Sequence, residues 1–179
     1  MAMNTRRRRA AWMGMLVLSI LLTACTGTAR LREASTLPSV ARERMLGNWH
    51  IIANVPYFAE RDKVATRVEY VQRSDGRVDD LYYFRRAPDA PEEHWSGVAW
   101  PLDDSAVRWK ARFIWPFTTE FWIVGVDANY EVALVATPDA KLGWVYARTA
   151  EITPERYQAA LAGLRAFGVD TTKMVRVPR

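Results

Sequence analysis

The chain has 179 residues, with 25 Lys and Arg against 20 Asp and Glu, a single Cys, and half of its residues apolar. This length suits one globular domain. Four of the basic residues form a run at 6–9, so the rest of the chain is almost neutral. A nearly neutral domain argues against nucleic acid as a partner, because phosphate binding depends on clustered Lys and Arg. One Cys excludes an intramolecular disulfide and a metal site built from several Cys.

Residues 1–24 have the pattern of a signal peptide. The basic run at 6–9 precedes an uncharged run of 13 residues at 10–22, whereas a helix that spans a bilayer needs about 20 apolar residues. A basic segment, a short apolar segment and small residues after it are typical of export. An ordinary exported protein with an unmodified Cys25 is one interpretation of this leader.

The position of the only Cys favours a second interpretation. Leu-Thr-Ala-Cys at 22–25 resembles the lipobox of bacterial lipoproteins. The resemblance implies cleavage before Cys25, a diacylglycerol on its thiol and an acyl chain such as palmitate on the new α-amine. Thr26 stands where an Asp would retain such a protein at the inner membrane, which implies the outer membrane and its periplasmic face. Several lipid chains on one residue anchor a protein stably, at about 0.8 kcal/mol per buried methylene.

Residues 25–40 are small and polar and include a Pro, which predicts a tether between the lipid anchor and the domain. Residues 41–179 are predicted to be the folded domain. This part contains no internal repeat of 20–50 residues.

Eight strands are predicted between residues 47 and 149. Trp109, Ala111 and Phe113 alternate with basic residues, a period of two that places one face in a core and the other in water. Turn residues such as those at 74–76 separate the runs. Short connections favour antiparallel neighbours, and eight strands in sequence close most simply into an up-and-down barrel, which has no free edges. The predicted strands are 47–54, 64–72, 77–86, 93–99, 106–113, 117–126, 130–137 and 143–149.

One helix is predicted after the strands. Thr153 is a good N-cap, Pro154 suits the first helical position, and Gly168 can end the helix in the left-handed region. Its apolar residues form a single stripe, so the helix is predicted to pack on the outside of the barrel. Residues 174–177 are candidates for a short terminal strand.

Three motifs resemble the signatures of lipocalins. Gly47-Asn48-Trp49 at the start of the first strand resembles their G-x-W motif. Residues 127–135, which begin with Asp127 and include Tyr130, are similar to the second signature, and Arg148 stands in the place of the Arg of the third. The resemblance is to the bacterial lipocalins and covers about residues 41–179. It implies an all-β, eight-stranded antiparallel up-and-down barrel with a C-terminal helix packed outside. It also implies that Trp49 and Arg148 stack at the closed end of the barrel.

Inward aromatic residues are predicted to line a ligand cavity, since an eight-stranded barrel is wide enough for one small ligand. Arg67, Arg85 and Arg112 lie near strand ends, where they could pair with a carboxylate or phosphate head group, although solvated surface arginine is the simpler interpretation. The candidate ligand-binding residues are Tyr70, Tyr82, Phe84, Trp109, Phe113, Phe121 and Trp144.

The sequence contains no pattern that favours catalysis. His50 and His94 are its two histidines, and a lone His on a strand is more often a packing or surface residue. Asp79 and Asp80 are neighbours, which on a strand point to opposite faces and make a poor acid–base pair. A Gly-rich phosphate loop and a His/Cys/carboxylate cluster are both missing from the sequence. We therefore expect no catalytic residue, no metal and no cofactor.

Three functional hypotheses remain. The first is a membrane-anchored lipocalin that binds a fatty acid or lysophospholipid for lipid storage, transport or envelope maintenance, with a homodimer left open. The second is a lipocalin-fold enzyme that acts on a lipid-derived substrate, which would need a titratable residue inside the barrel. The third is a filled barrel that serves as an envelope interaction module, which predicts no cavity.

Overall fold

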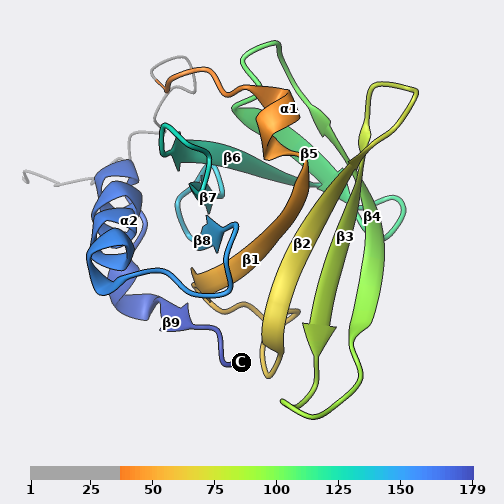
Figure 1. The fold of residues 1–179 in the computed structure, drawn as a ribbon. Helices are drawn as coiled ribbons and strands as arrows, with labels where there is room; N and C mark the ends of the chain where they lie inside the picture. The colour runs from red at the N-terminus through yellow and green to blue at the C-terminus, as the bar shows by residue number, and fades with distance from the viewer. Residues whose placement is uncertain (1–36) are drawn as a thin grey trace, which may run out of the picture.

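The computed structural model describes residues 37–179, and the predicted signal peptide and the lipidation of Cys25 lie outside this range. Eight antiparallel strands form a closed barrel, in which each strand pairs with its neighbour in the chain and β1 also pairs with β8 (Figure 1). This confirms the predicted eight-stranded up-and-down barrel, and each predicted strand end agrees to within two residues. The strands are β1 (Gly47–Asn54), β2 (Val64–Gln72), β3 (Val78–Arg85), β4 (Glu93–Pro101), β5 (Arg108–Arg112), β6 (Thr119–Val126), β7 (Val132–Ala136) and β8 (Gly143–Ala147).

The period of two in the sequence sets which side chains enter the barrel. On β3, Val78, Asp80, Tyr82 and Phe84 are buried, whereas the residues between them are half-buried. Alternation puts the buried set on the inner face of the pleated strand. Three of these four are apolar or aromatic, and the fourth is a carboxylic acid.

The predicted helix is α2 (Pro154–Phe167), which packs against the outer face of the barrel over β6, β7 and β8 (Figure 1). Thr153 caps its first turn by accepting a hydrogen bond from the backbone N–H of Arg156, and Gly168 ends it with φ of 118°. Leu164 and Phe167 are buried against the outward side chains of the barrel, among them Trp122. A short 3₁₀ helix, η2 (Thr171–Lys173), leads to β9 (Val175–Arg176), which pairs with the end of β1.

A short helix that the sequence did not reveal, α1 (Arg42–Met45), crosses one end of the barrel (Figure 1). The segment that contains α1 bonds to three different turns: Val40 donates to the carbonyl of Ser105, Arg42 to that of Gly76, and Arg44 to that of Ala128. Val40 is itself buried, so contact with the barrel begins inside the segment predicted as a tether. We call this covered end the closed end.

Trp49 and Arg148 meet at the closed end as the sequence predicted. The guanidinium carbon of Arg148 lies 3.7 Å from the centroid of the Trp49 ring, which is fully buried. The same guanidinium donates to the carbonyls of Asn48 and Arg44, and the indole N–H of Trp49 donates to the carbonyl of Met45 at 2.8 Å. The stack therefore holds α1 over the end of the barrel.

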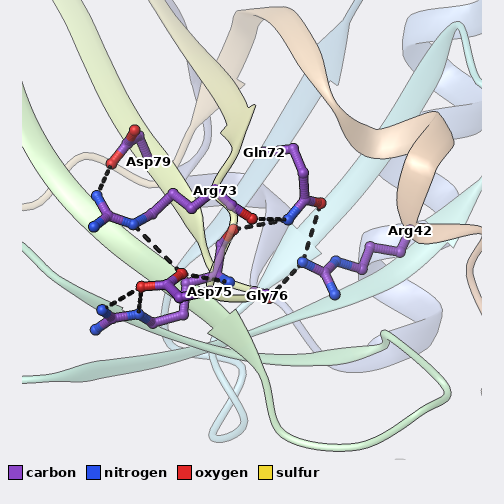
Figure 2. A network of polar contacts seen from close by, with 7 residues as sticks. Arg42, Gln72, Arg73, Asp75, Gly76 and Asp79 are labelled. Atoms are coloured by element: carbon purple, nitrogen blue, oxygen red, sulfur yellow. Dashed lines mark hydrogen bonds and ion pairs between the residues drawn. The ribbon is translucent and has the colours of Figure 1, made fainter.

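A polar network fastens α1 to the turn between β2 and β3 (Figure 2). Arg42 donates to the side-chain carbonyl of Gln72 at 3.2 Å and to the backbone carbonyl of Gly76 at 2.6 Å. Arg73 pairs with Asp79 at 2.7 Å. These groups are partly solvated, so each contact adds little stability by itself, but together they fix the turn against α1.

The opposite end, which we call the distal end, is formed by the connections 55–63, 86–92, 113–118 and 137–142. Four of its apolar side chains are largely exposed: Phe58 (85%), Ile114 (71%), Trp115 (78%) and Phe117 (74%). In residues 37–179 no helix has the length and apolar character needed to cross a bilayer.

Candidate ligand-binding site

Six of the seven predicted ligand-binding residues lie within or against the core of the barrel. Phe113 differs, because its side chain is 41% exposed at the distal end. A Cβ on Gly97 would lie 2.9 Å from the Phe113 ring, so this ring covers the inner face of β4 at Gly97. The six core residues are Tyr70, Tyr82, Phe84, Trp109, Phe121 and Trp144.

Aromatic side chains fill most of the barrel, where the sequence predicted a ligand cavity. A cavity of about 10 Å³ remains near the closed end, and its lining includes Tyr70, Trp109 and Phe121. A volume near 10 Å³ is about the size of one water molecule. Side chains must therefore move before the barrel can hold a lipid chain.

An aromatic strip runs along the inner face of β3 and β4 toward the distal end. Tyr82 stacks on Trp95 with ring centroids 5.7 Å apart, and Phe84 packs against Trp95 at 5.0 Å. Trp95 is 40% exposed, although it lies on an inner face. The strip therefore connects the core to the surface.

The connection 55–63 enters the distal end of the barrel and places Glu60 inside. The Glu60 carboxylate accepts hydrogen bonds from Nε1 of Trp144 at 3.0 Å and from Nδ2 of Asn54 at 2.5 Å. The Tyr57 ring packs edge-on against Trp144, with 6.4 Å between centroids. Burial raises the pKa of Glu60 to about 7, and its two hydrogen bonds and the charge of Lys63 only partly offset this rise.

Asp80 is a second carboxyl inside the barrel. It is buried, and its Oδ1 has no hydrogen-bond partner among the described residues. Burial alone raises the pKa of Asp80 to about 7. The opposite orientations predicted for Asp79 and Asp80 are confirmed, since Asp79 pairs with Arg73 outside the barrel. The alternation of β3 could have placed Asp80 inside, because it is in phase with Tyr82 and Phe84.

Tyrosine hydroxyls surround the two carboxyls. Tyr70 lies directly opposite Asp80 in the register of β2 and β3. Burial raises the pKa of Tyr57 and of Tyr146, and the charges of Glu60 and Asp80 raise both pKa values further. The charges of both carboxyls therefore act on the same two hydroxyls.

The three arginines considered for a lipid head group all have partners outside the barrel. Arg67 pairs with Glu92 at 2.8 Å, Arg85 donates to backbone carbonyls of its own hairpin, and Arg112 lies 6.0 Å from the Trp100 ring centroid. They lie out of phase with the inward residues of their strands, so their use for a ligand is not supported. Two cations lie near the aromatic strip. The nearer is Lys63, whose Nζ lies 4.8 Å from the Phe84 ring centroid and 4.4 Å from that of Trp95, and the other is Arg86, 5.7 Å from the Phe84 centroid. Lys63 lies in a connection without periodicity, which explains why the sequence did not reveal it.

The histidines are not part of the interior. His50 is out of phase with the buried Trp49 and Ile51, and partial burial together with the charges of Arg179 and Arg67 lowers its pKa. His94 packs against Tyr83 at 5.3 Å. Within residues 37–179 no group of three or more His, Cys, Asp and Glu could hold a metal ion. Glu60 and Asp80 nevertheless meet the condition that the enzyme hypothesis set, a titratable residue inside the barrel.

The remaining motif residues lie at the closed end. Gly47 has φ of 83°, a backbone conformation that favours glycine. Asp127 accepts a hydrogen bond from the backbone N–H of Glu131 at 2.7 Å and pairs with Arg156 of α2 at 2.5 Å. The hydroxyl of Tyr130 accepts a hydrogen bond from the backbone N–H of Ala41 at 2.7 Å.

An eight-stranded up-and-down barrel with one closed end and an aromatic interior is the architecture of proteins that enclose a small apolar ligand. The family model of the lipocalin-like domain matches residues 40–179, and the chain belongs to this family. Its coarse functional class is therefore a lipocalin that binds small hydrophobic molecules.

Two kinds of relatives support this assignment. The chain is 26% identical over 163 residues to the outer membrane lipoprotein Blc of Citrobacter freundii, covering 89% of this chain and 90% of that protein. It is also 26% identical over 166 residues to temperature-induced lipocalin-1 of Arabidopsis thaliana, covering 83% of this chain and 84% of that protein.

Solved structures share the fold at lower identity. Lobster apocrustacyanin A1 is 15% identical with a TM-score of 0.63, over 77% of this chain and 79% of that chain. Insecticyanin from the tobacco hornworm Manduca sexta is 17% identical with a TM-score of 0.63, over 80% of this chain and 82% of that chain. At these identities the likeness concerns the fold alone.

Proposed function

We propose that this protein is a membrane-anchored lipocalin that holds a fatty acid or lysophospholipid in its barrel, for lipid storage, transport or envelope maintenance. The observation that carries the proposal is the aromatic strip of Tyr82, Phe84 and Trp95, which runs from the core to the distal end. A lipid chain laid along the strip would leave water, at about 25 cal/mol per Å² of buried apolar area. Lys63 lies over the outer part of the strip and could pair with a carboxylate or phosphate at the entrance.

Binding needs a movement of the connection 55–63. Tyr57 and Glu60 occupy the distal part of the interior, and the cavity left beneath them is about 10 Å³. Pockets for small molecules usually measure about 300–1,000 Å³. The ligand chain would therefore displace these side chains rather than enter an existing space.

Two observations support a location at the outer membrane. The relatives from Citrobacter freundii and Escherichia coli are outer membrane lipoproteins by name, and the Cys25 motif supplies a lipid attachment site. Phe58 and Trp115 add an exposed apolar rim at the distal end, which suits an entrance for lipid. The anchor at Cys25 is tested in the full chain: Cys25→Ser should abolish incorporation of labelled lipid and release the protein from the membrane, and unchanged labelling would refute it.

The ligand is tested with a protein that starts at Thr26, because residues 37–179 contain the complete barrel with its own core. Titration with fatty acids and lysophospholipids of increasing chain length should change its tryptophan fluorescence. Affinity should rise by up to about 0.8 kcal/mol per methylene and then level off as the barrel is filled. Binding that does not depend on chain length would indicate an outer patch and would refute the proposal.

A matched pair of variants locates the binding site. Trp95 and Trp100 both lie on β4, but Trp95 stacks inside the barrel and Trp100 lies beside Arg112 on the outer face. Trp95→Ala should weaken binding of every chain length, whereas Trp100→Ala should leave it unchanged.

The filled-barrel interaction module is a second candidate, because the cavity of about 10 Å³ is what that hypothesis predicts. The same titration separates the two candidates. A module without ligand should show no saturable response to any chain length.

A further inference from the structure

The interior of the barrel contains an acidic group that is not needed for holding a hydrocarbon chain. Asp80 is buried, and its Oδ1 has no hydrogen-bond partner among the described residues. A buried polar atom without a partner costs about 1–3 kcal/mol, so Oδ1 of Asp80 favours a ligand that supplies the missing contact.

No basic side chain of the described residues offsets the charge of Asp80. Burial is the only effect that shifts its pKa, whereas the charge of Lys63 acts on Glu60. Tyrosines lie near Asp80: Tyr70 is directly opposite it on β2, Tyr82 is two residues along the same face of β3, and its charge raises the pKa of Tyr57 and of Tyr146. Carboxylates and aromatic faces together are the surroundings that proteins use for organic cations.

A route leads from the distal end to Asp80. Asp80 lies directly opposite Gly97 in the register of β3 and β4. Gly97 has no side chain, and the Phe113 ring covers its position. Because Phe113 is 41% exposed, it can move without disturbing the packed core, and its displacement would open the space beside Asp80.

We propose that Asp80, with the tyrosines around it, binds the ammonium group of a single-chain amphiphile. This rests on the proposed lipid-binding function and narrows its ligand from any single-chain lipid to one that carries an ammonium. The ammonium contacts Oδ1 of Asp80, and the chain follows Tyr82, Phe84 and Trp95 toward the distal end, so that the head group lies deep in the barrel and not beside Lys63 at the entrance. A fatty acid fits this site poorly, because its carboxylate would meet the two acidic side chains.

The donor set indicates an organic cation rather than a metal ion. Glu60 and Asp80 are two carboxyls, and residues 37–179 contain no cluster of three or more metal-binding side chains. Glu60 is also held by Trp144 and Asn54. Two natural sources carry an ammonium on a single chain: a free long-chain amine and the zwitterionic head group of a lysophospholipid.

The test is a titration of the protein that starts at Thr26 with four probes of the same chain length, each below its critical micelle concentration. The probes are dodecylammonium, dodecylphosphocholine, dodecanol and dodecanoate. At pH 8.5 we expect dodecylammonium to bind at least about tenfold more tightly than dodecanol, and dodecanoate to bind more weakly than dodecanol. If dodecylphosphocholine binds as tightly as dodecylammonium, the natural ligand is a lysophospholipid. If it binds only as tightly as dodecanol, the natural ligand is a free amine.

Neighbouring residues of β3 provide the variant and its control. Asp80→Asn should weaken the binding of dodecylammonium about tenfold and change the binding of dodecanol less than twofold. Asp79→Asn, which alters a carboxyl outside the barrel, should change neither probe. Equal binding of dodecylammonium and dodecanol to the unmodified protein overturns the ammonium site while lipid binding stands. Failure of all four probes to bind overturns both proposals.

The pH dependence of the unmodified protein gives an independent measurement. A primary amine stays protonated well above pH 8.5, so a change in its affinity reports on the protein. Affinity for dodecylammonium should rise about tenfold from pH 5.5 to 8.5 as the interior ionises. Glu60 also loses its proton over this range and adds to the rise in affinity. The tyrosines near Asp80 stay neutral, and Lys63 lies at the distal end, so these groups do not contribute to the rise. The rise should persist in Asp79→Asn and be mostly lost in Asp80→Asn, and a rise of equal size in both variants would contradict the assignment to Asp80.

Discussion

The closed end and the interior of the barrel are built from similar residues with different results. At the closed end, Trp49 and Arg148 stack at 3.7 Å, and their polar hydrogens reach carbonyls of α1 and β1. Inside the barrel, Asp80 is just as buried as many core residues but lacks a partner for one oxygen. Nearer the distal end, Trp95 lies on an inner face and is 40% exposed. The stack at the closed end has partners for its polar hydrogens, whereas the interior of the barrel leaves one carboxyl oxygen without a partner among the described residues.

This contrast separates stability from function within one sheet. Proteins generally satisfy buried polar groups, so an exception requires an explanation. The closed end contributes packing that the fold needs. The interior has a carboxyl, Asp80, that weakens the fold at neutral pH, which makes it a candidate for a residue retained for binding.

The largest expected effect concerns the closed end. Trp49→Ala should destabilise the domain by about 3–5 kcal/mol, because it removes a fully buried indole and its hydrogen bond to the carbonyl of Met45. Chemical denaturation of the protein that starts at Thr26 measures the loss. An unfolding curve like that of the unmodified protein would mean that the closed end does not carry the stability assigned to it.

The next effect concerns the carboxyl inside the barrel and has the opposite sign at neutral pH. Since burial raises the pKa of Asp80 to about 7, the folded protein keeps this proton between about pH 4 and 7, where the unfolded chain has released it. The free energy of unfolding should therefore fall as the pH rises through this window and level off above it. In Asp80→Asn this decrease in the free energy of unfolding should be smaller by about 2–4 kcal/mol. Chemical denaturation at several pH values measures the free energy of unfolding of Asp80→Asn and of the control Asp79→Asn. Parallel pH profiles for the two variants would argue against a raised pKa for Asp80.

A smaller effect tests the attachment of α1. The Tyr130 hydroxyl accepts a hydrogen bond from the backbone N–H of Ala41, and the Tyr130 ring lies 3.9 Å from the guanidinium of Arg44. Tyr130→Phe keeps the ring and should cost about 1 kcal/mol, the usual contribution of one hydrogen bond. Amide hydrogen exchange at Ala41 should become faster. Unchanged exchange would show that α1 is held without this bond.

The smallest effect concerns the exposed rim. Trp115 is 78% exposed, so Trp115→Ala should change the free energy of unfolding by less than about 0.5 kcal/mol. Thermal melting beside Trp49→Ala compares two tryptophans at opposite ends of one barrel. A loss above about 1 kcal/mol would show that the Trp115 side chain packs against the domain.

The fold could be predicted closely because most of its signals are local. Alternation located all eight barrel strands, and the pair Thr153 and Gly168 located both ends of α2. The short helix α1 has no such signal: four residues cannot show a helical period, and contacts with distant turns hold it in place. The predicted cavity was the main error, because composition shows how many aromatic side chains are present but not how completely they fill the barrel.

The sequence by itself determined the barrel and its inward aromatic faces, because strand periodicity and turn residues act over short distances. The stack of Trp49 and Arg148 was implied by the resemblance to lipocalins and is present in the structure. Only the tertiary structure decided that Glu60 enters the barrel, since it lies in a connection without periodicity and is held by Trp144, 84 positions later in the chain. It also decided the chemistry of Asp80. The alternation of β3 points this side chain inward, but only the closure of the barrel around it removes water and leaves its carboxyl without a partner.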